Sequence, residues 1–101
     1  MSAFGMVGKL ATDAKDRGAL IDILTDAADL MQDADGCNLY VVSKDADDEG
    51  AVWVMELWDS KEAHDLSLTL DGVRELIGKA MPLLKGEHSS VNLVPVSGKG
   101  L

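Results

Sequence analysis

Two apolar segments, CNLYVVSK (37–44) and AVWVMELW (51–58), are separated only by the polar run DADDEG (45–50). Both segments are rich in β-branched and aromatic residues, which favour β-strands. A connection this short predicts that the two strands pair as an antiparallel hairpin. The hairpin lies in the middle of the chain, so the elements before and after it must pack around it.

A helix is predicted before the hairpin, over residues 20–31. Apolar residues recur there at helical spacing and aspartates take the opposite face. Ahead of this helix, FGMVGKLA (4–11) reads as a first strand that two glycines weaken. The apolar stripe of the helix consists of Leu20, Ile23, Leu24, Ala27 and Met31, and the outer face carries Asp22, Asp26 and Asp29.

A second helix is predicted after the hairpin, from about residue 60. Asp59 with Glu62 three residues later resembles a capping box. The helix is expected to kink or restart around Asp71–Gly72 and to end at Pro82 and Gly86. VNLVPV (91–96) follows as a last strand, in which a proline indicates an edge position or the strand's end. Residues 97–101 are expected to form a flexible tail.

The resulting order, β-α-β-β-α-β, predicts an α+β, ferredoxin-like fold: a four-stranded antiparallel sheet with the helices on one face. A chain of 101 residues has room for one domain, here residues 1–101. The strands are apolar on both faces; Val52 and Val54 lie on one side of the third strand, and Met55 and Leu57 on the other. A second subunit is the simplest way to shield the apolar sheet face that the helices leave uncovered, so we expect a homodimer.

Charge and cysteine content exclude several functions. A net charge of −9 disfavours binding to nucleic acid or to an anionic membrane surface. The single cysteine, Cys37, cannot form an internal disulfide, and no signal peptide or stretch of 18 apolar residues is visible. We therefore expect a cytoplasmic protein.

Common cofactor and metal motifs are not found in the sequence. Residues 45–56 fit much of an EF-hand loop, but strands instead of helices flank them, so an acidic hairpin turn is favoured. His64 and His88 have no partner at metal-ligand spacing, and no Walker, GxGxxG or GxSxG motif is present. Cys37 is interpreted as a small packed strand residue. The sequence thus predicts neither a metal nor a cofactor.

Four residues remain as candidates for a site. Glu56 and Trp58 project from the same strand face, Tyr40 belongs to the neighbouring strand, and His64 falls in the first turns of the next helix. In a structural interpretation, Trp58 anchors the core and Glu56 pairs with a cation or a backbone donor. In a functional interpretation, a partly buried Glu56 binds a ligand and His64 accepts a proton.

The segment from Gly36 to His64 resembles the antibiotic biosynthesis monooxygenase family of dimeric α+β barrel proteins. The residues that carry the resemblance are Gly36, Cys37, Tyr40, Glu56, Trp58, Ser60, Glu62, Ala63 and His64. The resemblance implies a homodimer that oxidises a quinol or a polycyclic hydroxylated aromatic with O₂ and uses no cofactor. It also implies His64 and Glu56 as catalytic residues, and Trp58, Tyr40 and Asn38 as substrate-binding residues.

Some positions depart from the family pattern. Ser67 stands where many relatives have a second histidine, and Leu66 and Leu76 stand where the haem-degrading branch would have a tryptophan and a haem-ligating histidine. The first strand also lacks the asparagine of that branch, so haem degradation is disfavoured. Two alternatives stay open: a non-catalytic small-ligand-binding or stress-associated protein on the same barrel, and an interaction protein without a cavity.

Overall fold

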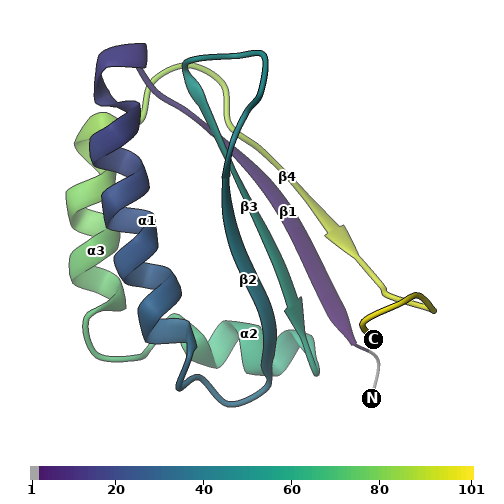
Figure 1. The fold of residues 1–101 in the computed structure, drawn as a ribbon. Coiled ribbons are helices and arrows are strands. Elements are labelled where there is room, and N and C mark those ends of the chain that lie inside the picture. The colour runs from purple at the N-terminus through teal and green to yellow at the C-terminus, as the bar shows by residue number, and fades with distance from the viewer. Residues whose placement is uncertain (1–2) are drawn as a thin grey trace.

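The computed structural model describes residues 3–101 and contains one antiparallel sheet in the order β2-β3-β1-β4. The main helices lie on one face of this sheet and leave the other face open (Figure 1). The predicted α+β, ferredoxin-like fold is thereby confirmed. The elements are β1 (Phe4–Ala11), α1 (Arg17–Met31), β2 (Cys37–Lys44), β3 (Ala51–Trp58), α2 (Lys61–Ser67), α3 (Val73–Ala80) and β4 (Ser89–Leu93).

The predicted hairpin is formed by β2 and β3, and its register places Tyr40 opposite Glu56. Cys37 pairs with Trp58 and Leu39 with Leu57, so Asn38 is the extra residue of a β-bulge. The acidic run before Ala51 is a hairpin turn, in which the Asp45 carboxylate accepts hydrogen bonds from the backbone N–H groups of Asp47 and Asp48.

Helix α2 begins near residue 60 as predicted, whereas the start of α1 and the capping residue of α2 differ from the prediction. Helix α1 begins at Arg17, three residues early, because a short 3₁₀ turn leads directly into it. The prediction of a capping box at Asp59 and Glu62 was wrong. Ser60 is the N-cap of α2, and its Oγ accepts a hydrogen bond from the Ala63 N–H at 3.1 Å. The predicted restart near residue 72 is confirmed, with Gly72 at φ +89° just before α3.

The last strand was also misplaced. It spans Ser89–Leu93 instead of 91–96, because pairing with residues 5–9 of β1 fixes its position. The apolar run VNLVPV therefore extends beyond the sheet, and Pro95 lies after the strand. β4 forms one edge of the sheet and ends before Pro95, so both placements that the proline indicated are observed.

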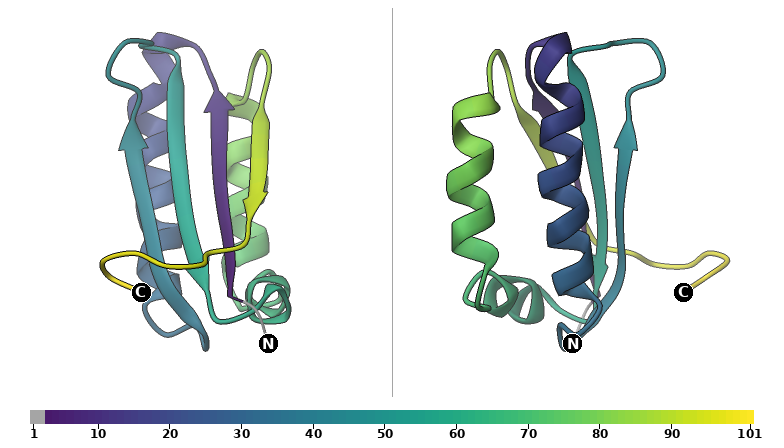
Figure 2. Two further views of the ribbon diagram at one scale, coloured as in Figure 1. Left: turned by 90° about the vertical axis from the view of Figure 1, so that its right-hand side faces the viewer. Right: turned by 60° about the vertical axis from the view of Figure 1, so that its left-hand side comes forward.

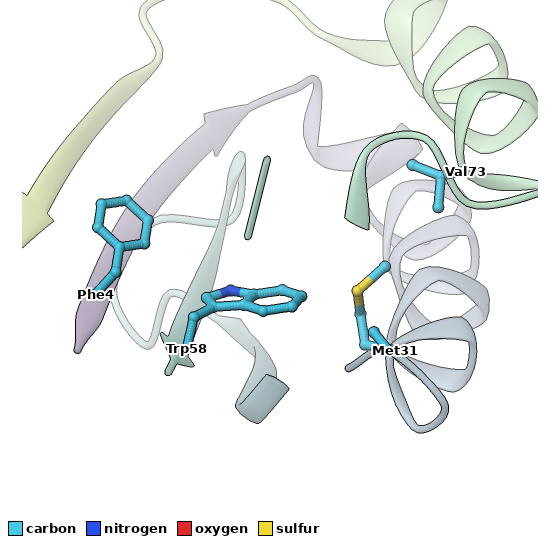
Figure 3. Packing of buried hydrophobic residues seen from close by; sticks show 5 residues of the cluster. Phe4, Met31, Trp58 and Val73 are labelled. Atoms are coloured by element: carbon cyan, nitrogen blue, oxygen red, sulfur yellow. The ribbon is translucent and has the colours of Figure 1, made fainter. Parts of the chain in front are cut away.

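The core between sheet and helices is centred on Trp58, whose side chain is fully buried. Figure 3 shows its indole between Phe4 of β1 and Met31 of α1, with Val73 of α3 nearby. A second buried cluster, around Leu20, joins α1 to the other end of β3. The two clusters fix α1 along the sheet, while α3 packs mainly on α1.

The open face of the sheet is apolar and partly exposed, most of all at Val41, Met55, Val91 and Leu93. After β4 the chain crosses the lower end of this face, where the tail lies near Leu39 and Leu57 (Figure 2). No helix in residues 3–101 is long and apolar enough to cross a membrane.

Candidate active site

A cavity of about 240 Å³ lies between the sheet and the helices. Its wall is largely apolar, and four side chains with polar atoms interrupt it: Tyr40, Glu56, His64 and Ser67. An apolar cavity with a few convergent polar groups is typical of small-molecule sites. Three of the residues proposed from the sequence are therefore brought together in one cavity.

Glu56 is the acid at the centre of this site. Its side chain is 13% exposed, and its Oε1 accepts a hydrogen bond from Trp58 Nε1 at 3.1 Å. Burial raises the pKa of Glu56, while the hydrogen bond from Trp58 and the neighbouring His64 act in the opposite direction. Tyr40 lies opposite Glu56, and burial together with the Glu56 charge raises the pKa of Tyr40.

His64 lies between two carboxyl groups. Its Nε2 is 4.0 Å from Glu56 Oε1, and its Nδ1 is 3.0 Å from Asp65 Oδ1. Hydrogen bonds from Lys61 and His64 lower the pKa of Asp65, so this carboxylate can only accept. Nδ1 therefore carries a hydrogen, and Nε2 is the nitrogen that can accept a proton on the Glu56 side.

The position of His64 is set by aromatic and backbone contacts. Its ring centroid lies 5.3 Å from that of Phe4 and 5.7 Å from that of Trp58, edge-on to the indole. The Ser67 hydroxyl donates to the His64 carbonyl and stabilises the turn that carries the imidazole. Ser60 at the start of α2 fixes the same turn from the other side.

Two residues proposed to bind substrate lie outside the cavity wall. Trp58 is packed beneath Glu56 in the core, so its one polar atom holds the carboxylate. Asn38 is exposed on the bulge and donates to Asp59 Oδ1 at 2.9 Å. Neither side chain lines the cavity that Glu56, His64 and Tyr40 share.

Sequence reasoning missed most of the apolar wall. Helix α3 supplies Val73, Leu76 and Ile77, and α1 supplies Ile23 and Met31. The α1 residues belonged to the predicted apolar stripe, which signalled burial but not a cavity. Among the described residues, no three His, Cys, Asp or Glu side chains converge to hold a metal ion.

The fold and the site together define a ferredoxin-like α+β protein with an enclosed acid–imidazole pair in an apolar cavity. The family model for antibiotic biosynthesis monooxygenases matches residues 3–79, which include β1 to β3 and nearly all of α3. The chain belongs to this family.

Solved structures agree with this membership. A candidate antibiotic biosynthesis monooxygenase from Chloroflexus aurantiacus J-10-fl is 39% identical, with a TM-score of 0.82 and 96% of each chain covered. A similar candidate from Deinococcus radiodurans is 26% identical, with a TM-score of 0.82 and 94% of each chain covered. Rv0793 from Mycobacterium tuberculosis, at 20% identity, shares the fold, with a TM-score of 0.85 over 97% of this chain and 99% of that one. No curated protein matches the chain.

Proposed function

We propose that the protein is a monooxygenase that oxidises a quinol or a polycyclic hydroxylated aromatic with O₂ and needs no cofactor. The observation that carries the proposal is the placement of Glu56, His64 and Tyr40 around one apolar cavity. Family membership supports the reaction class, and the apolar wall suits an aromatic ring.

The reaction balances without a further electron source. Loss of a hydroxyl proton gives an electron-rich anion, which transfers electrons to O₂ and forms a carbon–oxygen bond at a ring carbon. The resulting hydroperoxide loses water, so the attacked ring C–H carbon and the carbon that carried the hydroxyl both end as C=O. One oxygen atom of O₂ stays in the product, and the other leaves as water with the ring hydrogen and the hydroxyl hydrogen. All four electrons that reduce O₂ come from the substrate.

In this proposal the protein handles the protons. His64 Nε2 or the Glu56 carboxylate takes the hydroxyl proton, since both lie at the cavity and only 4.0 Å apart. Two groups this close share protons as a pair, so the first deprotonation belongs to the pair and not to one residue. Exclusion of water by the apolar wall protects the anion from reprotonation.

The proposal includes a homodimer in the cytoplasm. A second copy on the open face would cover Met55 and Leu93, which are 42% and 46% exposed. A single, half-buried cysteine suits a reducing compartment.

Oxygen uptake tests the proposed reaction. The purified protein is given a panel of quinols and hydroxylated polycyclic aromatics, and accepted substrates are compared among variants. We expect His64→Ala and Glu56→Gln each to lower kcat/KM by about 100-fold or more. Glu62→Gln, an exposed carboxyl in α2, is the matched control and should behave as the wild type. If His64→Ala and Glu56→Gln both equal the wild type on every accepted substrate, the proposed roles are wrong.

A non-catalytic ligand-binding protein is the alternative, because Glu56 already accepts a hydrogen bond from Trp58. In that case aromatic ligands would bind in the cavity but no member of the panel would consume O₂.

A further inference from the structure

A second cavity adjoins the cavity at Glu56 and lies toward the β4 edge of the sheet. This second cavity has a volume of about 380 Å³. The two share Leu10, Leu24, Tyr40 and Glu56 as lining residues. Tyr40 and Glu56 therefore lie between the two cavities, which together are called the trough below.

The floor of the second cavity is open because Gly8 has no side chain. Gly8 pairs with Val54 on one side and with Ser90 on the other, so all three residues face the helices in one row across the sheet. A Cβ at Gly8 would meet only the Ser89 carbonyl oxygen at 3.7 Å and Ser90 Cβ at 4.0 Å, which are ordinary contacts. The gap in this row therefore results from the missing side chain of Gly8 alone.

The far end of the trough carries hydrogen-bond donors. His88 lines it, and His88 Nδ1 accepts from the Ala11 N–H at 3.1 Å. In the neutral ring this leaves the hydrogen on Nε2, which can donate to a ligand. Ser90, two residues along the same face, adds a hydroxyl.

We infer that the site has a distal subsite, formed by Ser90 and His88 across the gap at Gly8, for a carbonyl oxygen at the far end of an elongated fused-ring substrate. The inference rests on the proposed function in one respect, because it places the reacting hydroxyl at Glu56. Ser90 lies two strands and two residues from Glu56, or about 12 Å at ordinary sheet spacings. A single ring cannot reach both groups, whereas a fused-ring ligand can.

The charge pattern favours a neutral acceptor over an anion. The chain carries a net charge of −9, and the nearby Lys9 ammonium is 3.7 Å from Asp48 Oδ2 on the opposite face. No described lysine or arginine other than Lys9 lines the cavity. A carbonyl accepts from two neutral donors without bringing a further negative charge into an acidic protein.

Two naphthols that differ in one carbonyl group test the subsite. 6-Acetyl-2-naphthol carries the carbonyl at the end remote from its hydroxyl, and 6-ethyl-2-naphthol lacks it. Binding is measured by anaerobic fluorescence titration, so that no turnover intervenes, and hydroquinone serves as the one-ring ligand. We expect the wild type to bind the acetyl compound about fivefold more tightly than the ethyl compound.

Three variants locate the effect. Ser90→Ala should reduce the acetyl-to-ethyl preference to about twofold, because His88 can still donate to the carbonyl. Ser89→Ala is the matched control and should keep it. Ser89 lines the cavity through its backbone carbonyl, which the substitution leaves in place, whereas its side chain projects from the other face with that of Lys9. Gly8→Val should fill the gap and weaken both naphthols by about tenfold or more, while leaving the affinity for hydroquinone unchanged.

A wild-type preference near one, no binding of either naphthol, or equal preferences in Ser90→Ala and Ser89→Ala would overturn the subsite. So would wild-type naphthol affinity in Gly8→Val. These outcomes are separate from the fate of the proposed reaction. Oxygen uptake with hydroquinone but no naphthol preference removes the subsite alone, and the expected preference without any oxygen uptake removes the monooxygenase alone.

Discussion

Replacement of Trp58 by phenylalanine tests the contact on which the site is built. The indole is fully buried, and its Nε1 donates to a carboxylate that is itself largely shielded from water. Phenylalanine keeps an aromatic ring between Phe4 and Met31 but removes the donor and part of the ring system. Glu56 then loses its hydrogen bond inside an apolar environment.

The expected loss of stability follows from two contributions. Removing two buried ring carbons costs about 2 kcal/mol. Removing a hydrogen bond to a charged group costs a further ~2 kcal/mol. The sum, about 4 kcal/mol, is a large fraction of the ~5–15 kcal/mol that stabilises a domain of this size.

Urea unfolding followed by far-ultraviolet circular dichroism measures this loss. At a fixed protein concentration and pH 8, we expect the midpoint of Trp58→Phe to fall by about 2 M. Trp53→Phe is the matched control: Trp53 Nε1 also donates to a carboxylate, Asp45 Oδ2 at 2.8 Å, but Trp53 is only half-buried, whereas Trp58 is fully buried. Its midpoint should change much less.

A double-mutant cycle with Glu56→Gln isolates the hydrogen bond from the packing. A neutral amide oxygen accepts more weakly than a carboxylate, so Trp58→Phe should cost about 1 kcal/mol less in the Glu56→Gln background than in the wild type. Equal costs in both backgrounds would show that the indole N–H does not support Glu56. A Trp58→Phe midpoint like that of Trp53→Phe would refute the assignment of Trp58 as the central core residue.

Three further predictions follow from the same contacts. Burial raises the pKa of Glu56, so between the ordinary glutamate pKa and the raised one the native state holds a proton that the unfolded state has released. The free energy of unfolding should therefore fall as the pH rises through this range. Urea midpoints measured between pH 4 and 8 should show this fall in the wild type and a weaker fall in Glu56→Gln. Gly36 has φ +81°, and a Cβ there would lie 2.8 Å from Ala63 Cβ. Thermal unfolding should therefore show Gly36→Ala destabilised by about 2 kcal/mol. Gly78 lies inside α3 with open space where a Cβ would be, so Gly78→Ala should be stabilised by about 0.5–1 kcal/mol. Met55→Glu on the open face should halve the mass measured by sedimentation if the protein is a homodimer, and Leu66→Glu, which is 67% exposed on α2, should leave it unchanged.

The strands and the order of elements could be predicted because they depend on local patterns. Strand alternation already placed Glu56 and Trp58 on one face, and the short turn fixed the hairpin that brings Tyr40 opposite Glu56. The ends of the elements depended on partners elsewhere in the chain. The local sequence predicted Asp59 as the N-cap, but in the folded chain the Asp59 carboxylate accepts a hydrogen bond from Asn38, and Ser60 caps the helix.

The site was predictable only in part for the same reason. Which residues share a strand face follows from period two, but the direction of the Trp58 indole depends on how α1 packs above it. Asn38 seemed to lie with Tyr40, yet the bulge turns it toward Asp59. The wall from α3 depends on the docking of that helix on α1, which no local pattern reports.

The three residues that depart from the family pattern, Leu66, Ser67 and Leu76, differ in whether they line the cavity. Leu66 is exposed and does not line the cavity, so its identity says little about the chemistry, whereas Leu76 forms part of the wall. Ser67 lines the cavity, but its hydroxyl is bound to the His64 carbonyl and cannot replace a second imidazole as a base. The site therefore holds one imidazole and one buried carboxyl. In the proposed reaction this pair takes up the single proton whose loss activates a phenol toward O₂, and it releases that proton before the next proposed cycle.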